Sequence, residues 1–234
     1  MKLLEQLRLR KTVRAITRRT LLIRGATIAL LGLVLITGIV YMISVFYNTK
    51  GSFTISLNKY DVIQNGLSLS ENAQFIFPTE RLTVNPLTNV NNISVYDLPD
   101  NLGDFDGDHG TKDYIAYTFY IKNAGINTCT YSASINIINS TMGIDAAVRV
   151  RVYKNNVYTD YAKLKNDGTG PERGTTPFLS QTVVYSENRV QFAPDDVDKY
   201  TIVVWLEGDD PECVDDIIGG TIKMQMDFKI IESS

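Results

Sequence analysis

The stretch from residue 103 to residue 113 combines acidic side chains with glycine. Its four aspartates are Asp104, Asp106, Asp108 and Asp113. Carboxylates on alternate residues are hard oxygen ligands of the kind that Ca²⁺ prefers, and glycine permits a tight reversal of the chain. The stretch differs from an EF-hand loop because position twelve, counted from Asp104, is Ile115 rather than glutamate. Two interpretations stay open, a calcium site and a solvated acidic turn.

A second group of acidic residues lies closer to the C-terminus. It consists of Asp195, Asp196, Asp198, Glu207, Asp209, Asp210, Glu212, Asp215 and Asp216. Such residues complement the start of a short helix and keep a surface soluble, which is the ordinary interpretation. The alternative is a weak site for a divalent cation or a partner protein at one end of the fold.

Catalytic chemistry has little support in the sequence. His109 is the single histidine, so no second histidine is present for a zinc site, and no spacing suggests a Ser-His-Asp arrangement. A histidine in an acidic, glycine-rich stretch is ordinarily a solvated loop residue. We therefore expect no enzymatic activity. A secreted hydrolase that uses acidic residues is the alternative, and the sequence nominates no residue for it.

Cys129 and Cys213 are the two cysteines. If both lie outside the cytoplasm, oxidising conditions permit a disulfide between them. Such a bridge would close a loop of more than 80 residues and stabilise the fold by about 4 kcal/mol. Two free, buried thiols are the alternative.

An uncharged, mostly apolar run at residues 25–47 separates two parts of opposite charge. Before it are eight basic residues and one acidic residue, a net charge of +7; from residue 25 onward, 15 basic and 25 acidic residues give −10. As an α-helix the run spans roughly 34 Å, enough to cross a hydrocarbon core of about 30 Å. Basic residues beside a span stay in the cytoplasm. The residues that set this orientation are Arg14, Arg18, Arg19 and Arg24.

We therefore expect a single-pass membrane protein with residues 1–24 in the cytoplasm and its C-terminal part outside. The lipid bilayer, and no nucleic acid, is the expected partner of the basic tail. A cleaved signal peptide is the alternative. Its apolar core is normally about 7–15 residues and ends in a small-x-small site, neither of which is found here, although Ser44 keeps cleavage open.

The part after the span reads as β-structure. Residues 222–230 and 148–153 alternate between apolar and polar side chains, and Asn155 with Asn156 predicts a hairpin turn after the second of these. Further strands are expected at residues 53–57, 74–77, 92–96, 114–122, 131–138, 182–185 and 200–206. Many short strands predict an all-β fold, an antiparallel two-sheet sandwich of jelly-roll or immunoglobulin-like type.

One helix and the domain boundaries complete the expected organisation. Asp210 as N-cap, Pro211 at the first position and glycines at 219 and 220 predict a short helix. Residues 48–58 are a juxtamembrane linker or a first strand, and residues 59–234 form one sandwich domain.

The N-terminal part of the chain has its segments in a distinct order: a basic tail, an apolar run, an aromatic and polar stretch at residues 45–49, and Gly-Ser-Phe-Thr-Ile-Ser-Leu at 51–57. In this order it resembles exported proteins of the TasA and camelysin type in Gram-positive bacteria. The stretch Val-Val-Trp-Leu-Glu-Gly-Asp-Asp at 203–210 looks like a strand and loop of related clostridial proteins. The resemblance implies a jelly-roll-like sandwich at the cell surface or in the biofilm matrix, with fibres formed by strand donation in some members. The small-residue cleavage site is not evident here, and no metal-binding motif supports carrying over protease activity.

The leading functional hypothesis is a membrane-anchored surface module with a structural, adhesive or matrix-associated role. Its partners would be other surface or matrix proteins, or further copies of itself, bound at strand edges and acidic loops. The second hypothesis is a fibre subunit, cleaved near Ser44, that donates the strand at residues 51–57 to a neighbour.

Overall fold

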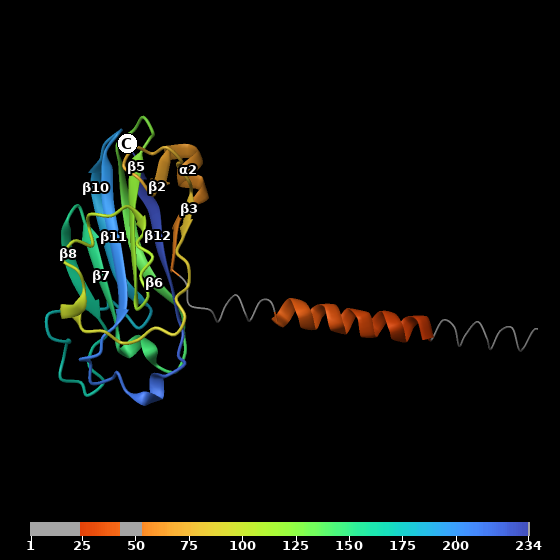
Figure 1. Ribbon diagram of the computed structural model, residues 1–234. Helices are drawn as coiled ribbons and strands as arrows, with labels where there is room; N and C mark the ends of the chain where they lie inside the picture. Colours follow the sequence, from red (N-terminus) through yellow and green to blue (C-terminus); the bar gives the residue numbers. More distant parts are fainter. Residues whose placement is uncertain (1–23, 43–52, 234) are drawn as a thin grey trace, which may run out of the picture. The chain divides into compact units, whose positions relative to one another are not determined.

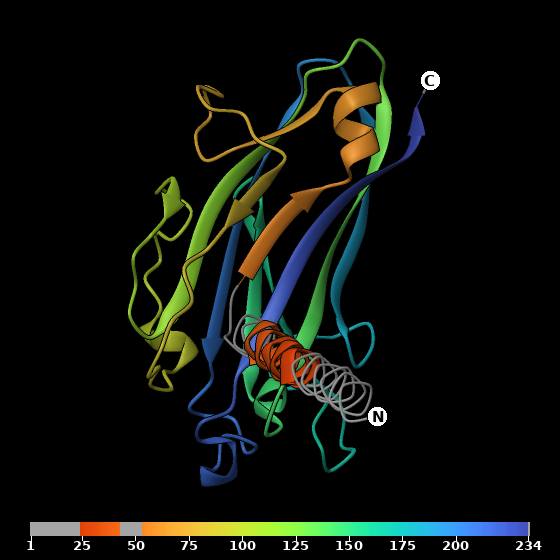
Figure 2. The same ribbon diagram turned by 90° about the vertical axis from the view of Figure 1, so that its right-hand side faces the viewer.

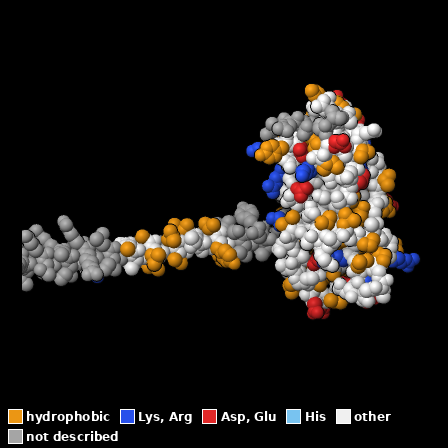
Figure 3. All heavy atoms as spheres, turned by 180° about the vertical axis from the view of Figure 1, so that it is seen from behind, with side chains coloured by type: hydrophobic (Ala, Val, Ile, Leu, Met, Phe, Trp, Pro, Cys, Tyr) orange, Lys and Arg blue, Asp and Glu red, His pale blue; other side chains and the backbone are white. Residues whose placement is uncertain are grey.

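The computed structural model describes residues 24–42 and 53–233, and the chain divides into the units Met1–Tyr47 and Asn48–Ser234. In the first unit the described part is the α-helix Arg24–Met42, with 19 residues and a mean hydropathy of 2.2. Hydrophobic side chains cover it along its length (Figure 3). It rises about 28 Å, close to the thickness of a hydrocarbon core. The predicted residues 43–47, Arg14, Arg18 and Arg19 lie outside the described residues.

The polar side chains within this helix are satisfied by the helix itself. The Thr37 hydroxyl donates to the carbonyl oxygens of Leu33 and Val34, at 3.0 and 2.9 Å, and the Thr27 hydroxyl donates to that of Arg24. Hydroxyls bonded in this way add little cost to insertion in lipid. Within residues 24–42 and 53–233, one helix, the N-terminal one, is long and apolar enough to cross a membrane.

The second unit consists mostly of β-strands in two sheets (Figure 1). The five-stranded sheet contains, in spatial order, β10 (Val183–Phe192), β6 (Cys129–Ser140), β12 (Ile222–Ser233), β1 (Phe53–Leu57) and β3 (Arg81–Thr83). The seven-stranded sheet contains β2 (Leu67–Ser70), β5 (Tyr114–Asn123), β11 (Val197–Leu206), β7 (Val148–Lys154), β8 (Val157–Ala162) and β9 (Thr176–Pro177), with β4 (Gly107–Asp108) beside β5. The short helices are α2 (Lys59–Asn65), η1 (Val95–Asp97), η2 (Ile144–Ala146) and η3 (Asp215–Ile217).

Both sheets are mixed rather than purely antiparallel. β1 runs parallel to β12, with Phe53 opposite Met224, and β8 runs parallel to β9. The other strand pairs are antiparallel, including the long central pairs of β11 with β5 and with β7. The prediction of an all-antiparallel arrangement is therefore wrong, because the first strand, β1, pairs in parallel with the last strand, β12.

The main hydrophobic core lies between the two sheets, whose strands run along a common long direction (Figure 2). Phe228 of β12 packs its ring against three buried rings, at centroid distances of 5.9 Å to Phe119, 5.4 Å to Tyr200 and 5.7 Å to Tyr131. Two of these rings belong to the opposite sheet. Edge-to-face contacts of this kind hold the two layers in register.

The seven-stranded sheet is buried on its other face as well. The segment between β3 and β5 crosses that face, and its Leu98 and Leu102 form a second cluster with Val203 and Trp205. The Trp205 indole N–H donates to Glu207 Oε2 at 2.9 Å. Trp205 therefore anchors this outer cluster rather than the space between the sheets. The prediction that the strands at 114–122 and 200–206 are central and covered on two sides is confirmed.

Several local predictions are confirmed and others are wrong. The turn after β7 uses Asn155 and Asn156 at φ of 48° and 72°, as the sequence indicates. Residues 74–77 form turns, and residues 92–96 contribute one bridge at Ile93 and the start of η1 instead of a strand. A short apolar stretch can lie in a surface loop when other segments take the strand positions of the sheet, so its composition alone does not make it a strand.

Two helical predictions need correction. Asp210 begins a turn in which the backbone N–H of Glu212 donates to Asp210 Oδ1, and helical geometry appears only at η3. The helix α2 was not among the predicted elements; Asn58 caps it by accepting from the Tyr60 N–H, and Gly66 ends it at φ 71°. These are ordinary cap residues.

The boundary of the domain also moves. β1 lies between β12 and β3, and Phe53, Ile55 and Leu57 belong to the main core. Of the two alternatives for residues 48–58, a strand is therefore found at Phe53–Leu57, so the domain begins before residue 59.

We predict that Tyr131→Phe lowers the free energy of unfolding by about 1–3 kcal/mol, because Asp198 then loses a buried donor. The Tyr131 hydroxyl donates to Asp198 Oδ2 at 2.6 Å. In the control, Tyr185→Phe, the acceptor that loses its donor is Glu187, whose side chain is 45% exposed and can bond water instead. Denaturation of the detergent-solubilised chain, followed by Trp205 fluorescence, measures both. Equal losses would contradict this account.

Candidate functional site

The predicted calcium stretch lies in the segment that covers the seven-stranded sheet. β4 pairs with β5 there, and the side chains around it bond to protein groups. Asp106 accepts from the Tyr120 hydroxyl at 2.6 Å, Asp108 from the Gly110 N–H at 2.9 Å, and Asp113 from the Asn91 N–H at 3.0 Å. These acceptors face three different donors.

The stretch does not bring its four aspartates together. Within residues 53–233, no three of Asp104, Asp106, Asp108 and Asp113 place carboxylate oxygens within 4.8 Å of one another. Calcium binding by this stretch stays a prediction. His109 Nε2 lies 3.1 Å from the Thr118 hydroxyl and 3.3 Å from the Phe105 carbonyl oxygen, and burial lowers the pKa of its ring.

The second predicted acidic group is divided between the two ends of the domain. At the end where β11 begins, Asp195 pairs with Lys122 at 2.7 Å and Asp198 is buried beside Tyr131. Glu207, Asp210 and Glu212 follow the other end of β11. The expectation of one site at one end therefore fails for three of its nine residues, Asp195, Asp196 and Asp198.

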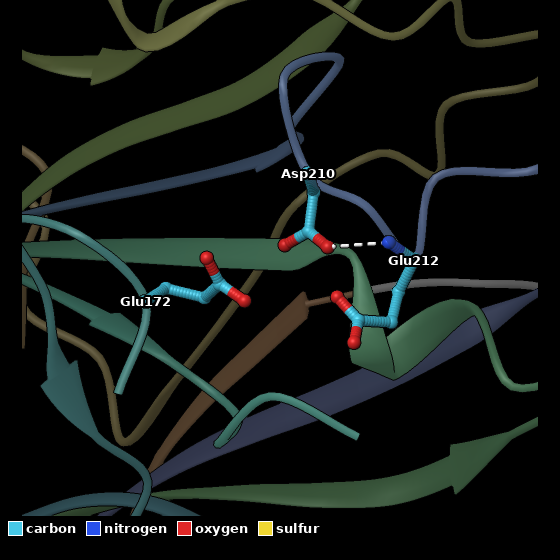
Figure 4. A group of neighbouring side chains, drawn as sticks. All are labelled: Glu172, Asp210 and Glu212. Carbon is cyan, nitrogen blue, oxygen red and sulfur yellow. Dashed lines mark hydrogen bonds between the residues drawn. The ribbon is translucent and has the colours of Figure 1, made fainter. Parts of the chain in front are cut away.

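Asp210 and Glu212 meet a third acidic residue, Glu172. One carboxylate oxygen from each of these three residues lies within 4.8 Å of the others. Their side chains converge from separate segments, Glu172 from the loop between β8 and β9 and the other two from the segment after β11 (Figure 4). We call these residues the acidic triad. It is the one such group of three or more acidic, cysteine or histidine ligands in the part of the chain described here.

Arg149 of β7 is the counter-charge of the triad. Its Nη2 forms an ion pair with Asp210 Oδ2 and lies 3.7 Å from Glu172 Oε2. The exposed fractions of these side chains are 4% for Arg149, 0% for Asp210 and 10% for Glu172. A charge group this far from water must be balanced locally.

The electrostatics within the triad are uneven. Burial, together with the neighbouring Glu212 carboxylate, raises the pKa of Asp210 to about 6. The Asp210 carboxyl group and the Asn166 N–H, which donates to Glu212 Oε1 at 2.9 Å, lower the pKa of Glu212.

Several buried polar atoms of this site have no hydrogen-bond partner. They are Glu172 Oε1, Glu212 Oε2, Asp210 Oδ2 and Arg149 Nη1. Asp210 Oδ2 still has its ion pair with Arg149, whereas Glu172 Oε1 and Glu212 Oε2 have no such contact within 4.0 Å. Buried carboxylate oxygens without donors are uncommon and costly.

Sequence reasoning identified Asp210 and Glu212 but missed Glu172 and Arg149. The alternation at residues 148–153 indicates that the arginines of β7 face water, whereas Arg149 and Arg151 are both buried. Arg151 pairs with Asp160 and lies 4.2 Å above the Tyr158 ring. The sequence gives no signal for this burial, because Glu172 and Asp210 meet Arg149 from distant parts of the chain.

The predicted disulfide is wrong, since Cys129 and Cys213 are both free. Cys129 begins β6 at the end of the domain where Asn123 and Phe192 lie, and Cys213 follows the opposite end of β11. The ten residues of β11 span about 33 Å between these ends. Bridged cysteines have Cα atoms about 4.4–6.8 Å apart.

A cavity of about 640 Å³ lies beside the triad segment. Residues 89–92, Trp205, Cys213 and Ile218 are among those that line it. Its Cys213 sulfur accepts from the Asn92 side-chain amide at 3.3 Å.

No protein-family model and no curated protein matches the chain. Two solved structures of the β-glucosidase from Kluyveromyces marxianus, one in complex with glucose and one labelled with selenomethionine, align with 68% of this chain. Identities are 12% and 11%, and TM-scores are 0.22 and 0.25. The chain spans 15% and 17% of those chains. Likeness at this level carries no argument about fold or function.

We predict that Arg149→Met destabilises the domain by about 3–5 kcal/mol, because buried carboxylates lose their cation. The matched control is Arg173→Met, which removes an exposed arginine next to Glu172 and should change stability by less than about 0.5 kcal/mol. Chemical denaturation measures both. A loss below about 1 kcal/mol for Arg149→Met would contradict the assigned role.

We also predict two reactive thiols per chain when the protein is unfolded in denaturant without reductant. Titration with a thiol-specific chromogenic disulfide counts them. A count of zero would mean that Cys129 and Cys213 are bridged and that the arrangement of the two ends is wrong.

Proposed function

We propose that this protein is a single-pass membrane protein whose β-domain lies outside the cytoplasm as a structural, adhesive or matrix-associated module. One observation carries the proposal: an apolar 19-residue helix, Arg24–Met42, precedes a separate β-rich unit in the same chain. A helix of this hydropathy is more stable in lipid than in water. Its role would be to keep the β-domain at the membrane surface.

Charge supports the orientation. The eight basic residues before residue 25 favour the cytoplasmic side, where anionic lipids attract basic residues. The proposal includes no catalytic role. The single histidine supports this, since its Nε2 is engaged with Thr118 and Phe105.

The binding surfaces of such a module would be its strand edge and its acidic loops. β10 is a ten-residue strand at one edge of the five-stranded sheet, so its outer backbone groups can pair with an added strand. Its register shifts opposite β6, together with Glu187 and Arg189, restrict which strands fit. Surface proteins, matrix proteins and further copies of this chain are the proposed partners, including those of a biofilm matrix.

Within this proposal the domain is a sandwich of jelly-roll rather than immunoglobulin-like type. Successive long strands change sheet: β5 to β6, β6 to β7, β10 to β11 and β11 to β12. Repeated crossing between layers is typical of two interlocked Greek keys. Immunoglobulin-like domains join more neighbouring strands within one sheet.

A second candidate function is a cleaved, fibre-forming subunit. It is favoured by the position of β1, which is the first strand of the described domain and pairs in parallel with β12 over five residues. The same strand from a neighbouring chain could fill that position without changing the other strand pairs. N-terminal sequencing of the native protein separates the two candidates. An intact start supports the anchor, and a start after residue 44 supports the fibre subunit.

We predict that replacing the four basic residues nearest the span by glutamine lowers the fraction of chains with the β-domain outside. These residues are Arg14, Arg18, Arg19 and Arg24. The loss of about 1 kcal/mol of attraction per residue weakens the preferred orientation. Protease added to intact cells measures the exposed fraction.

The matched control replaces four exposed basic residues that are distant from the span in the sequence, because charges there do not set topology. They are Arg81, Lys112, Arg173 and Lys229. A β-domain protected from protease in the unaltered chain would overturn the proposed orientation. Release of the chain from membranes by alkaline carbonate would overturn the membrane anchor.

A further inference from the structure

The acidic triad contains a buried ligand atom that the protein itself does not satisfy. Glu172 Oε1 has no hydrogen-bond partner although its side chain is 90% buried, counting from an exposed fraction of 10%. Its carboxylate points toward Asp210 and Glu212 (Figure 4). Glu212 Oε2 is also unpartnered. Buried acceptors that converge on one point indicate a missing positive partner.

The formal charge of the site indicates the charge that the missing partner should carry. Three carboxylates and the Arg149 guanidinium sum to −2, and the other donors to these carboxylates among the described residues are two neutral backbone N–H groups, those of Asn166 and Glu212. Among the residues described, no basic side chain other than Arg149 forms an ion pair with the triad. One divalent cation would bring the charge to zero, whereas a proton or a monovalent ion would leave it negative.

Ligand chemistry and spacing select the cation. All three ligands are carboxylates, which favour hard cations, and no cysteine or histidine belongs to the group. Two oxygens bound to one Ca²⁺ at about 2.4 Å can be at most about 4.8 Å apart. The triad oxygens meet this limit. Ligands from two irregular loops suit calcium better than magnesium, which demands near-ideal octahedral geometry.

We propose that Glu172, Asp210 and Glu212 bind one Ca²⁺ ion, which ties the loop between β8 and β9 to the segment after β11. Apart from the triad and Arg149, the described link between these segments is the Asn166 N–H bond to Glu212. The loop is otherwise closed on itself by the Leu164 to Pro171 bridge and the Lys165 to Gly170 bond. The cation would therefore hold the two loops together, which their own contacts do only through the one hydrogen bond from Asn166.

This inference is independent of the proposed function, because it concerns the domain on whichever side of the membrane it lies. It also differs from the calcium site predicted at residues 103–113, which uses other residues. The two sites can be separated by variants.

Calorimetric titration of the EDTA-treated, detergent-solubilised full chain with CaCl₂ tests the proposal. We expect one Ca²⁺ per chain and a rise in melting temperature of about 5–10 °C when calcium exceeds its dissociation constant a hundredfold. Glu172→Gln and Glu212→Gln keep the side-chain volume and should each weaken binding at least about tenfold. Asp216→Asn, an exposed acid in the same segment, is the matched control and should bind as the unaltered chain does.

Three results would overturn the proposal. The first is the absence of binding heat and of a melting shift at 10 mM calcium, a concentration about tenfold above the weakest range of extracellular modules. The second is unchanged affinity in both Glu172→Gln and Glu212→Gln. The third is binding that disappears in Asp104→Asn combined with Asp106→Asn but persists in the triad variants, which would assign the ion to the other stretch.

Discussion

The outer face of the seven-stranded sheet cannot remain in contact with water, and much of the domain follows from this constraint. β5 and β11 carry large side chains on both faces, among them Val203 and Trp205 on the outer one. Burial of these groups from water is worth about 1.5–3 kcal/mol each. Because the five-stranded sheet covers the inner face, loops must cover the outer one, and the long segment between β3 and β5 does so.

Loops that cover a sheet bring polar groups with them. Where the 163–175 loop and the segment after β11 approach β7, their carboxylates Glu172 and Asp210 are buried with Arg149. The neighbouring Arg151 of β7 is buried with Asp160 of β8. Arg151 and Asp160 form a complete pair through two hydrogen bonds. The triad has more negative than positive charge. The candidate site therefore results from the way in which loops cover the outer face. It lies where the buried carboxylates outnumber the buried basic groups.

Features with a local cause were predictable from sequence. Alternation over residues 222–230, the two asparagines after β7 and the apolar run before the domain each depend on neighbouring residues, and each has the expected structure. Features that depend on distant segments were not predictable. The parallel pairing of β1 with β12, the burial of Arg149 and the meeting of Glu172 with Asp210 join positions far apart in the chain. The free cysteines follow from the same cause, since only the fold sets the distance between the two ends of β11.

Hydrogen exchange with and without calcium tests most directly whether the outer loops are completed by a cation. The account predicts that calcium slows amide exchange in residues 163–175 and 207–214 while exchange in β5, β6 and β12 stays unchanged, because those strands are already stabilised by the main core. Unchanged exchange in both loops, or slowing confined to residues 103–113, would contradict it.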